Sequence, residues 1–358
     1  MSSPNATGCI ALVLSAAKAE SLPCSPTRLR NAVERSALLC QDVEVLGQGN
    51  GLIQVQRAWD WLKASAADSW ADIPLTMSVN SERFKRGIYL RQPNESNTAT
   101  SYQVTIAPKF PESATSDEKI SYERRLRLVS TAPWVQSPSH LLLLQEGKQF
   151  NVYVDPRKLD AGLHVEFVDV YDEDLPSEHS LLLRIPVTVA RPIAIPRGQR
   201  ELDLGSVALQ SGQRHRNFIV PPPGCTYVDI HIRDERKPTI TSVFASSQPF
   251  EGDDSLAVDE NNGEVMTNDD DTSRTIALHA LQLFTGTPYR DNEHDKYLAL
   301  QPGAQHVTSW AVHDEVTMEL VLAPLWNSIG TSRFNVILYF NGVVAVPRNI
   351  CMIGGQVW

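Results

Sequence analysis

The sequence has few cysteines, few aromatic residues and no long apolar segment. Its five cysteines among 358 residues are Cys9, Cys24, Cys40, Cys225 and Cys351, and no two of them have Cys-x-x-Cys spacing. An odd and scattered set predicts reduced thiols and argues against a disulfide framework or a zinc site. A membrane-spanning helix needs roughly 18 to 20 apolar residues, and no apolar run reaches that length. We therefore expect no membrane partner.

Basic residues are fewer than acidic ones. The chain has 32 Lys and Arg against 42 Asp and Glu, which gives a net charge of −10. Proteins that bind nucleic acids carry a basic stripe or patch, and the sequence shows none, so no nucleic acid is expected as a partner. Much of the acidity is local, because residues 251–271 hold nine Asp or Glu and no Lys or Arg.

This acidic segment does not have the ligand spacing of a calcium loop. An EF-hand loop places an oxygen ligand in its first position and glycine in its sixth. With Gly263 in the sixth position, Val258 takes the first, so the register is wrong. The favoured interpretation is a solvated, disordered insertion over about residues 246–273.

The nine histidines show no spacing that is typical of a metal or catalytic site, and none forms a His-Glu-x-x-His helix. His231 and His279 lie at polar-face positions of predicted strands, where exposure to solvent is expected. The carboxylate neighbours of His294 and His313 point to the opposite face of a strand. We predict no catalytic residue, metal ligand or cofactor-binding residue within the chain. A Ser-His-Asp set assembled from distant segments stays open at this point.

The chain begins with Met1-Ser2-Ser3-Pro4, ahead of an uncharged run over residues 5–17 that is rich in small residues. Ser3 and Pro4 suit the start of a helix, since serine caps free backbone N–H groups and proline fits the first helical position. A helix that is apolar all round is typical of the interior of a larger protein. The alternative is a secretory signal peptide, but Pro4 and Asn5 stand where a basic residue is expected.

Two further elements follow within the first 60 residues. Ser25-Pro26 starts a second predicted helix, which has apolar residues at helical spacing. The glycine cluster Gly47-Gln48-Gly49-Asn50-Gly51 then precedes a third one. A phosphate-binding loop follows a strand and opens a helix, whereas this cluster is expected to lead into a short strand. Turn glycines with positive φ are the favoured interpretation.

In order and separation, these elements resemble the end of the catalytic domain of subtilisin-like serine peptidases. That family carries Gly-Thr-Ser-Met-(Ala/Ser)-(Ser/Ala)-Pro, in which the catalytic serine precedes the methionine. The resemblance implies that Met1, Ser2, Ser3 and Pro4 are a remnant adjacent to the active site, and that the nucleophile stands immediately before Met1. A serine there would lie at the positive end of the helix macrodipole, which favours a developing oxyanion.

Longer segments narrow the resemblance to tripeptidyl peptidase II, over residue 1 to about 190 and more weakly to about 345. The family implies a serine exopeptidase that removes tripeptides from the free N termini of oligopeptides, without a cofactor. It also implies a homo-oligomer and a cytoplasmic location. The acidic segment 251–271 has no counterpart in it. The segments that carry the resemblance include Gly51-Leu-Ile-Gln-Val-Gln-Arg-Ala-Trp-Asp60, Arg86-Gly-Ile-Tyr-Leu-Arg91, Trp134-Val-Gln-Ser-Pro-Ser-His-Leu141 and residues 151–164.

Beyond residue 70 the hydrophobic period changes from that of a helix to two, which is typical of half-buried strands. Turn residues separate the alternating segments, and no helix long enough for a parallel βαβ sheet is expected. The first series of predicted strands is at 125–129, 150–154, 164–170 and 184–189, and the second is at 217–220, 227–232, 275–281, 316–322 and 333–340.

The predicted fold class is therefore mainly β. We expect a C-terminal helical piece of a subtilisin-like α/β catalytic domain at residues 1–68 and a fibronectin-type-like β-sandwich at 72–194. A jelly-roll-like sandwich with the acidic insertion follows at 197–358. The prolines of residues 190–198 indicate a linker. Residues 72–194 are expected to fold alone, whereas residues 1–65 are not.

The functional prediction has two classes. The first is a fragment of a tripeptidyl peptidase, inactive alone because its serine, histidine and aspartate all lie outside the chain. The second is a non-catalytic assembly or interaction module built from the two β domains. An all-apolar helix left exposed would favour aggregation, which argues against a free-standing module. We favour a partial sequence or truncated gene model that starts at an internal methionine.

Overall fold

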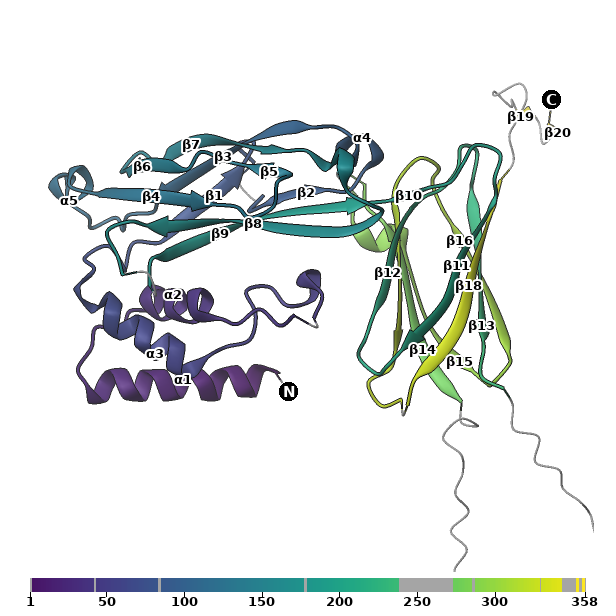
Figure 1. The fold of residues 1–358 in the computed structure, drawn as a ribbon, viewed down its shortest axis with the longest axis horizontal. Helices are drawn as coiled ribbons and strands as arrows, with labels where there is room; N and C mark the ends of the chain where they lie inside the picture. The colour runs from purple at the N-terminus through teal and green to yellow at the C-terminus, as the bar shows by residue number, and fades with distance from the viewer. Residues whose placement is uncertain are drawn as a thin grey trace, which may run out of the picture. The chain divides into compact units, whose positions relative to one another are not determined.

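The computed structural model describes residues 2–342 apart from 42, 83–84, 177–178, 238–272, 285–286 and 329, and also two short strands within residues 352–357. It divides into two units, Met1–Arg191 and Pro192–Trp358 (Figure 1). The prediction of a mainly β fold is confirmed, because strands make up most of both units after the first helices. The predicted acidic insertion falls outside the described residues.

The first unit starts with a layer of helices. Ser25 caps the second helix, as predicted: its Oγ accepts a hydrogen bond from the backbone N of Arg28 at 3.1 Å, and Pro26 occupies the first turn. Figure 1 shows α2 on the side of strand β9 and α1 farthest from the sheets. The elements of this layer are α1 (Ser2–Ala19), α2 (Pro26–Ser36), η1 (Val45–Gly47), α3 (Val55–Ala64) and η2 (Ser65–Ala67).

The glycine cluster forms turns, as predicted, but the expected short strand after it is wrong. Leu52 makes a single β-bridge with Leu38, and α3 begins at Val55. The reason is the close approach at Gly51, where φ is +111° and an added Cβ would lie 2.3 Å from the carbonyl oxygen of Leu38. A backbone that turns so tightly cannot continue as a pleated strand.

The helices share a small core. Val13 and Ala17 of α1 are buried together with Ala32 of α2 and with Trp61 and Leu62 of α3. The rest of α1 is only partly covered or is exposed, and its Leu12 side chain is 63% exposed. α1 is therefore held through its C-terminal half.

The rest of the first unit is a β-sandwich. One sheet has the strand order β1-β3-β7-β5 and the other β2-β9-β8-β4-β6. The alternation that predicted the strands appears in their burial, as in β4, where residues 124, 126 and 128 are buried and 123, 125 and 127 are exposed. The elements are β1 (Leu75–Val79), β2 (Ile88–Leu90), α4 (Pro93–Ser96), β3 (Thr100–Pro108), α5 (Ser116–Ile120), β4 (Glu123–Val129), β5 (Val135–Gln136), β6 (His140–Leu144), β7 (Lys148–Val154), η3 (Pro156–Lys158), β8 (Gly162–Asp172) and β9 (Leu181–Arg191).

The second unit is another sandwich, as predicted. Its sheets have the orders β10-β12-β17-β14-β15 and β11-β18-β13-β16, and one apolar core lies between them. The elements are β10 (Ile193–Ala194), β11 (Glu201–Leu209), β12 (His215–Val220), β13 (Tyr227–Asp234), β14 (Arg274–Gln282), η5 (Tyr289–Asn292), β15 (Glu293–Leu300), β16 (Gln305–Ala311), β17 (Met318–Pro324), β18 (Ser332–Asn341), β19 (Met352–Ile353) and β20 (Gln356–Val357).

The predicted linker at 190–198 is shorter than expected. Arg191 ends β9, and Ile193 and Ala194 pair in parallel with Ile219 and Val220 of β12. The second unit thus begins at residue 192, a few residues before the predicted 197. Prolines at 192 and 196 flank β10 at the edge of its sheet, where strands tolerate proline.

Polar side chains meet at the open edge of the second core between β15 and β16, which are the edge strands of their sheets. His294 Nε2 lies 3.1 Å from Thr308 Oγ1, and Lys296 Nζ donates to the same oxygen at 2.8 Å. The His294 ring stacks on Trp310. Burial and the neighbouring ammonium of Lys296 lower the pKa of His294, and burial lowers the pKa of His215 on β12.

The stability of the first sandwich should depend on residues 65–72. The free energy of unfolding of a fragment that begins at residue 73 is expected to be about 3 kcal/mol lower than that of a fragment that begins at 65. The reason is that the buried Arg124 loses one carboxylate, Asp68, and Tyr122 loses its edge contact with Trp70. Urea denaturation of fragments 65–191, 69–191 and 73–191 measures this, and the middle fragment separates the carboxylate from the indole. Equal midpoints for the longest and shortest fragments would contradict the dependence.

The second core should weaken in mild acid. Unfolded histidine has a pKa of about 6.5, and the folded pKa values of His294 and His215 are lower, so the unfolded chain binds more protons between pH 7 and 5. The stabilisation that comes from the two neutral histidines is therefore complete above this pH range and is lost as the pH falls through it. Amide protection factors in β14 and β17 should drop, and His294→Gln should reduce the drop. His231→Gln, on the outer face, is the control, and an unchanged pH dependence in His294→Gln with His215→Gln would refute this assignment.

Candidate functional site

The residues that sequence analysis placed next to an active site form the first turn of α1. Ser2, Ser3 and Pro4 are exposed, and Met1 lies outside the described residues. The carbonyl oxygen of Ser3 accepts a hydrogen bond from Thr7 Oγ1 at 2.9 Å, and this first turn contains no acidic residue. The positive end of the 18-residue helix therefore faces outward without a carboxylate of its own to neutralise it.

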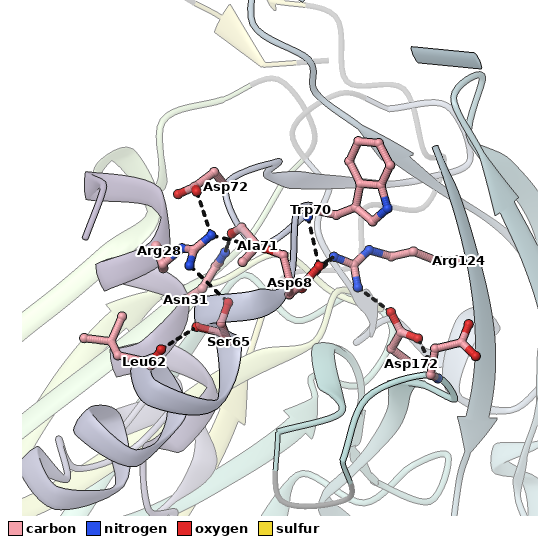
Figure 2. A network of polar contacts seen from close by, with 11 residues as sticks. Arg28, Asn31, Leu62, Ser65, Asp68, Trp70, Ala71, Asp72, Arg124 and Asp172 are labelled. Carbon is pink, nitrogen blue, oxygen red and sulfur yellow. Dashed lines mark hydrogen bonds and ion pairs between the residues drawn. The ribbon is translucent and has the colours of Figure 1, made fainter. Parts of the chain in front are cut away.

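Behind α1, a buried polar network joins α2 to the segment that follows α3 (Figure 2). Arg28 donates through Nη1 to the carbonyl oxygen of Ser65 at 3.0 Å, and through Nη2 to the carbonyl oxygen of Asp68 at 3.2 Å and to the Asp72 carboxylate at 2.8 Å. The cap residue Ser25 also donates to Asp72. The end of α3 and the start of α2 are thus fixed to one stretch of backbone.

The network continues into the sandwich through Arg124 of β4. Its Nη2 donates to both carboxylate oxygens of Asp68, at 3.1 and 2.9 Å, and its Nη1 donates to Asp172 at the end of β8. The three side chains are 6%, 8% and 3% exposed. Asp68 also accepts from the backbone N of Trp70 at 2.9 Å. One guanidinium therefore holds two carboxylates that are 104 residues apart in the sequence.

A third arginine lies near Arg124 and Asp68. Arg35 of α2 lies over the Trp61 ring, 5.3 Å from its centroid. Burial, and then the repulsion of Arg124, lower the pKa of Arg35 to about 10, while the charge of Asp68 opposes this fall. Even so, Arg35 stays charged at neutral pH.

Sequence analysis missed this network, although one signal for it was present. Arg124 stands at an inward position of an alternating strand, in phase with Leu126 and Leu128. A charged residue at such a position is almost never buried without a partner. The alternation of inward and outward residues along β4 therefore indicated a buried ion pair, but it could not indicate that the partners were Asp68 and Asp172.

The histidines of the second unit do not assemble a catalytic site among the described residues. His279 is 33% exposed and bonds Glu293 through Nε2 at 2.5 Å. His231 bonds Gln305 and packs against Tyr339. Both face away from the core, and neither lies beside a serine that is hydrogen-bonded to it.

The carboxylates near His313 serve the backbone instead. Asp314 accepts a hydrogen bond from the Gly224 N at 2.7 Å. Within the described ranges, no group of three or more His, Cys, Asp or Glu side chains could hold a metal ion. The four cysteines there, Cys9, Cys24, Cys40 and Cys225, are free. None of the helices in the described parts is long and apolar enough to cross a membrane.

Comparison with protein families gives two matches, one in each unit. Residues 73–190 match the first Ig-like domain of tripeptidyl-peptidase II, and residues 262–330 match the galactose-binding domain-like region of the same enzyme. The first match covers nearly the whole sandwich of the first unit. The second covers β14 to β17 and the segments between them.

Individual relatives agree with these matches. Tripeptidyl-peptidase 2 of Oryza sativa subsp. japonica is 35% identical over 259 residues, which are 70% of this chain and 18% of the relative. Tripeptidyl-peptidase 2 of Drosophila melanogaster is 26% identical over 98% of this chain and 23% of its own length. A crystal structure of tripeptidyl peptidase 2 superposes with a TM-score of 0.77 at 25% identity, over 95% of this chain and 26% of that one.

The chain therefore spans about a fifth to a quarter of the length of the relatives it matches. The resemblance inferred from the sequence motifs is confirmed by both domain matches and by the superposition. The chain belongs to the tripeptidyl-peptidase II family.

Proposed function

We propose that this chain supplies the helix after the nucleophile, and two β domains, to a subtilisin-like serine exopeptidase. That enzyme would remove tripeptides from the free N termini of oligopeptides. The observation that carries the proposal is the outward-facing first turn of α1, with Met1-Ser2-Ser3-Pro4 at its start. The family membership supports the reaction class.

In this proposal the catalytic serine immediately precedes Met1. Its Oγ attacks the scissile carbonyl carbon, an upstream histidine takes the proton, and an upstream aspartate orients the imidazole. The unpaired N–H groups of the first turn of α1 lie at the positive end of the macrodipole, beside the developing oxyanion. Residues 1–68 are then a piece of the catalytic domain. No cofactor takes part.

The proposal extends to the setting of the enzyme. The substrate class is oligopeptides, the location is the cytoplasm, and the assembly is a homo-oligomer. All three rest on the family resemblance. The free thiols are compatible with a reducing compartment.

A second candidate function, an assembly module, is favoured by one specific surface. β6 is the last strand of its sheet, and its Leu142 and Leu144 side chains are 44% and 39% exposed. Exposed apolar residues on an unpaired edge are a site for pairing with another chain. A homo-oligomeric peptidase could use this edge between subunits.

The isolated chain is expected to have no peptidase activity, because loss of the serine alone costs about a millionfold in turnover in subtilisin. Release of chromophore from an Ala-Ala-Phe substrate measures this. The same chain expressed in frame with its upstream coding segment should be active and should react with a serine-directed fluorophosphonate. An in-frame Gly-Thr-Ser codon triplet is expected directly before Met1. Activity of the isolated chain above a no-protein control would overturn the proposal.

The β6 edge gives an independent prediction for the second candidate. Leu142→Lys with Leu144→Lys should shift the sedimentation of the full protein toward smaller species, because charged side chains block edge pairing. Tyr297→Lys, at a 66% exposed position on β15, is the matched control. Unchanged sedimentation of the double leucine variant would exclude β6 as an assembly contact.

A further inference from the structure

We propose that Arg124 is a positioning residue for the peptidase active site, although it lies in the β-sandwich and not in the catalytic domain. It would fix the helical layer on which α1 rests, and so the direction of the helix that follows the nucleophile. This inference rests on the function proposed above. Three contacts within the first unit connect Arg124 to the first turn of α1.

The first step is the contact between the sandwich and the segment after α3. Arg124 donates to both carboxylate oxygens of Asp68 and, from its other terminal nitrogen, to Asp172 (Figure 2). The donors of a guanidinium are held in a rigid planar fork, so bonds from Nη2 to Asp68 and from Nη1 to Asp172 fix the direction between the two carboxylates. All three side chains are buried, so water does not screen or replace these bonds.

The second step leads from Asp68 to the helices. Its carbonyl oxygen accepts from Arg28 of α2, which also donates to the carbonyl oxygen of Ser65 at the end of α3. Asn31 of α2 donates to the Ala71 carbonyl oxygen at 3.2 Å. A displacement of Asp68 therefore moves backbone to which α2 and α3 are both attached.

The third step is the contact between α3 and α1. Val13 and Ala17 pack on Trp61 and Leu62, while the N-terminal half of α1 is largely exposed. At 1.5 Å per residue, Ser2 lies about 16 Å along the axis from Val13. A tilt of about 4° at that contact then displaces the first turn by about 1 Å. A displacement of that size can cost about a hundredfold in rate.

The structure offers a close pair of arginines for the test. Arg124 and Arg125 are neighbours on β4, and each pairs with an aspartate. Arg125 points to the outer face, where its pair with Asp174 is 63% and 50% exposed. Exposed pairs of this kind contribute little to stability. The same substitution at the two positions therefore separates the buried contact from a general effect of the change.

The experiment uses the full peptidase, expressed with its upstream segment, and measures tripeptide release. Arg124→Lys keeps the charge but cannot bond Asp68 and Asp172 from two nitrogens at once. We therefore expect kcat to fall at least tenfold while KM stays within twofold. Asp68→Asn should give the same loss, and the double variant should be no worse than either single one. Arg125→Lys should keep wild-type kcat. Circular dichroism and gel filtration report whether each variant is folded and assembled.

The outcomes separate the two proposals. A folded wild-type protein with no activity overturns the proposed function and this inference with it. An active wild type together with an Arg124→Lys variant of unchanged kcat overturns only the inference, as does a change confined to KM. If the Arg124→Lys variant does not fold, the kcat of the Asp68→Asn variant tests the inference in its place. Failure of both variants to fold would show a purely structural role and would also overturn the inference.

Discussion

The first unit depends on one buried cation, the guanidinium of Arg124, and on the two carboxylates that share it. A charge enters a protein interior at a high cost in solvation, which only close and well-directed partners offset. Here the partners come from both sides of the junction: Asp68 ends the helical layer, and Asp172 ends a strand of the sandwich. Removing either would leave charge buried without compensation. Helices and sandwich are therefore held as one unit, although their apolar cores are separate.

The other charged residues of the network position or compensate the pair formed by Arg124 and Asp68. Asp68 needs its backbone fixed so that its carboxylate meets Arg124, and Arg28 supplies this by binding the Asp68 carbonyl oxygen. Asp72 compensates Arg28, and Arg35 lies over the Trp61 ring. The second unit has a buried ion pair of its own, in which Arg236 pairs with Asp234 and both side chains are 4% exposed. At the edge between β15 and β16, Lys296 and His294 meet the Thr308 hydroxyl, and charged residues on edge strands discourage pairing with other chains.

Local features of the sequence predicted local structure well. The period of two located β4, β7, β8 and β9 within a few residues, since alternation directly reports which side of a strand is buried. Ser25-Pro26 marked the start of α2 because capping and proline geometry are properties of adjacent residues. The expected strand after Gly51 was wrong because a bridge to Leu38 depends on a distant backbone approach. The ion network had partners 44 to 56 residues apart, and a single sequence contains no record of which charges meet. The family was inferred from the order of the first elements and from longer segments up to about residue 190, and the motif at Met1 to Pro4 indicated the proposed site, because both resemble known sequences and not because their geometry could be foreseen.

The order of synthesis gives the Arg124 contact a further consequence. A ribosome makes α1 before α3, and Asp68 before Asp172, at about 5 to 20 residues per second. Asp172 follows Asp68 by 104 positions, so roughly 5 to 20 seconds pass between the synthesis of Asp68 and that of Asp172. The ion network of the first unit is incomplete during that time. During that time the apolar surface of α1 near Leu12 and Val13 has emerged without its final support. Completion of the ion network behind the first helices is therefore coupled to the synthesis of a β domain that follows them in the chain.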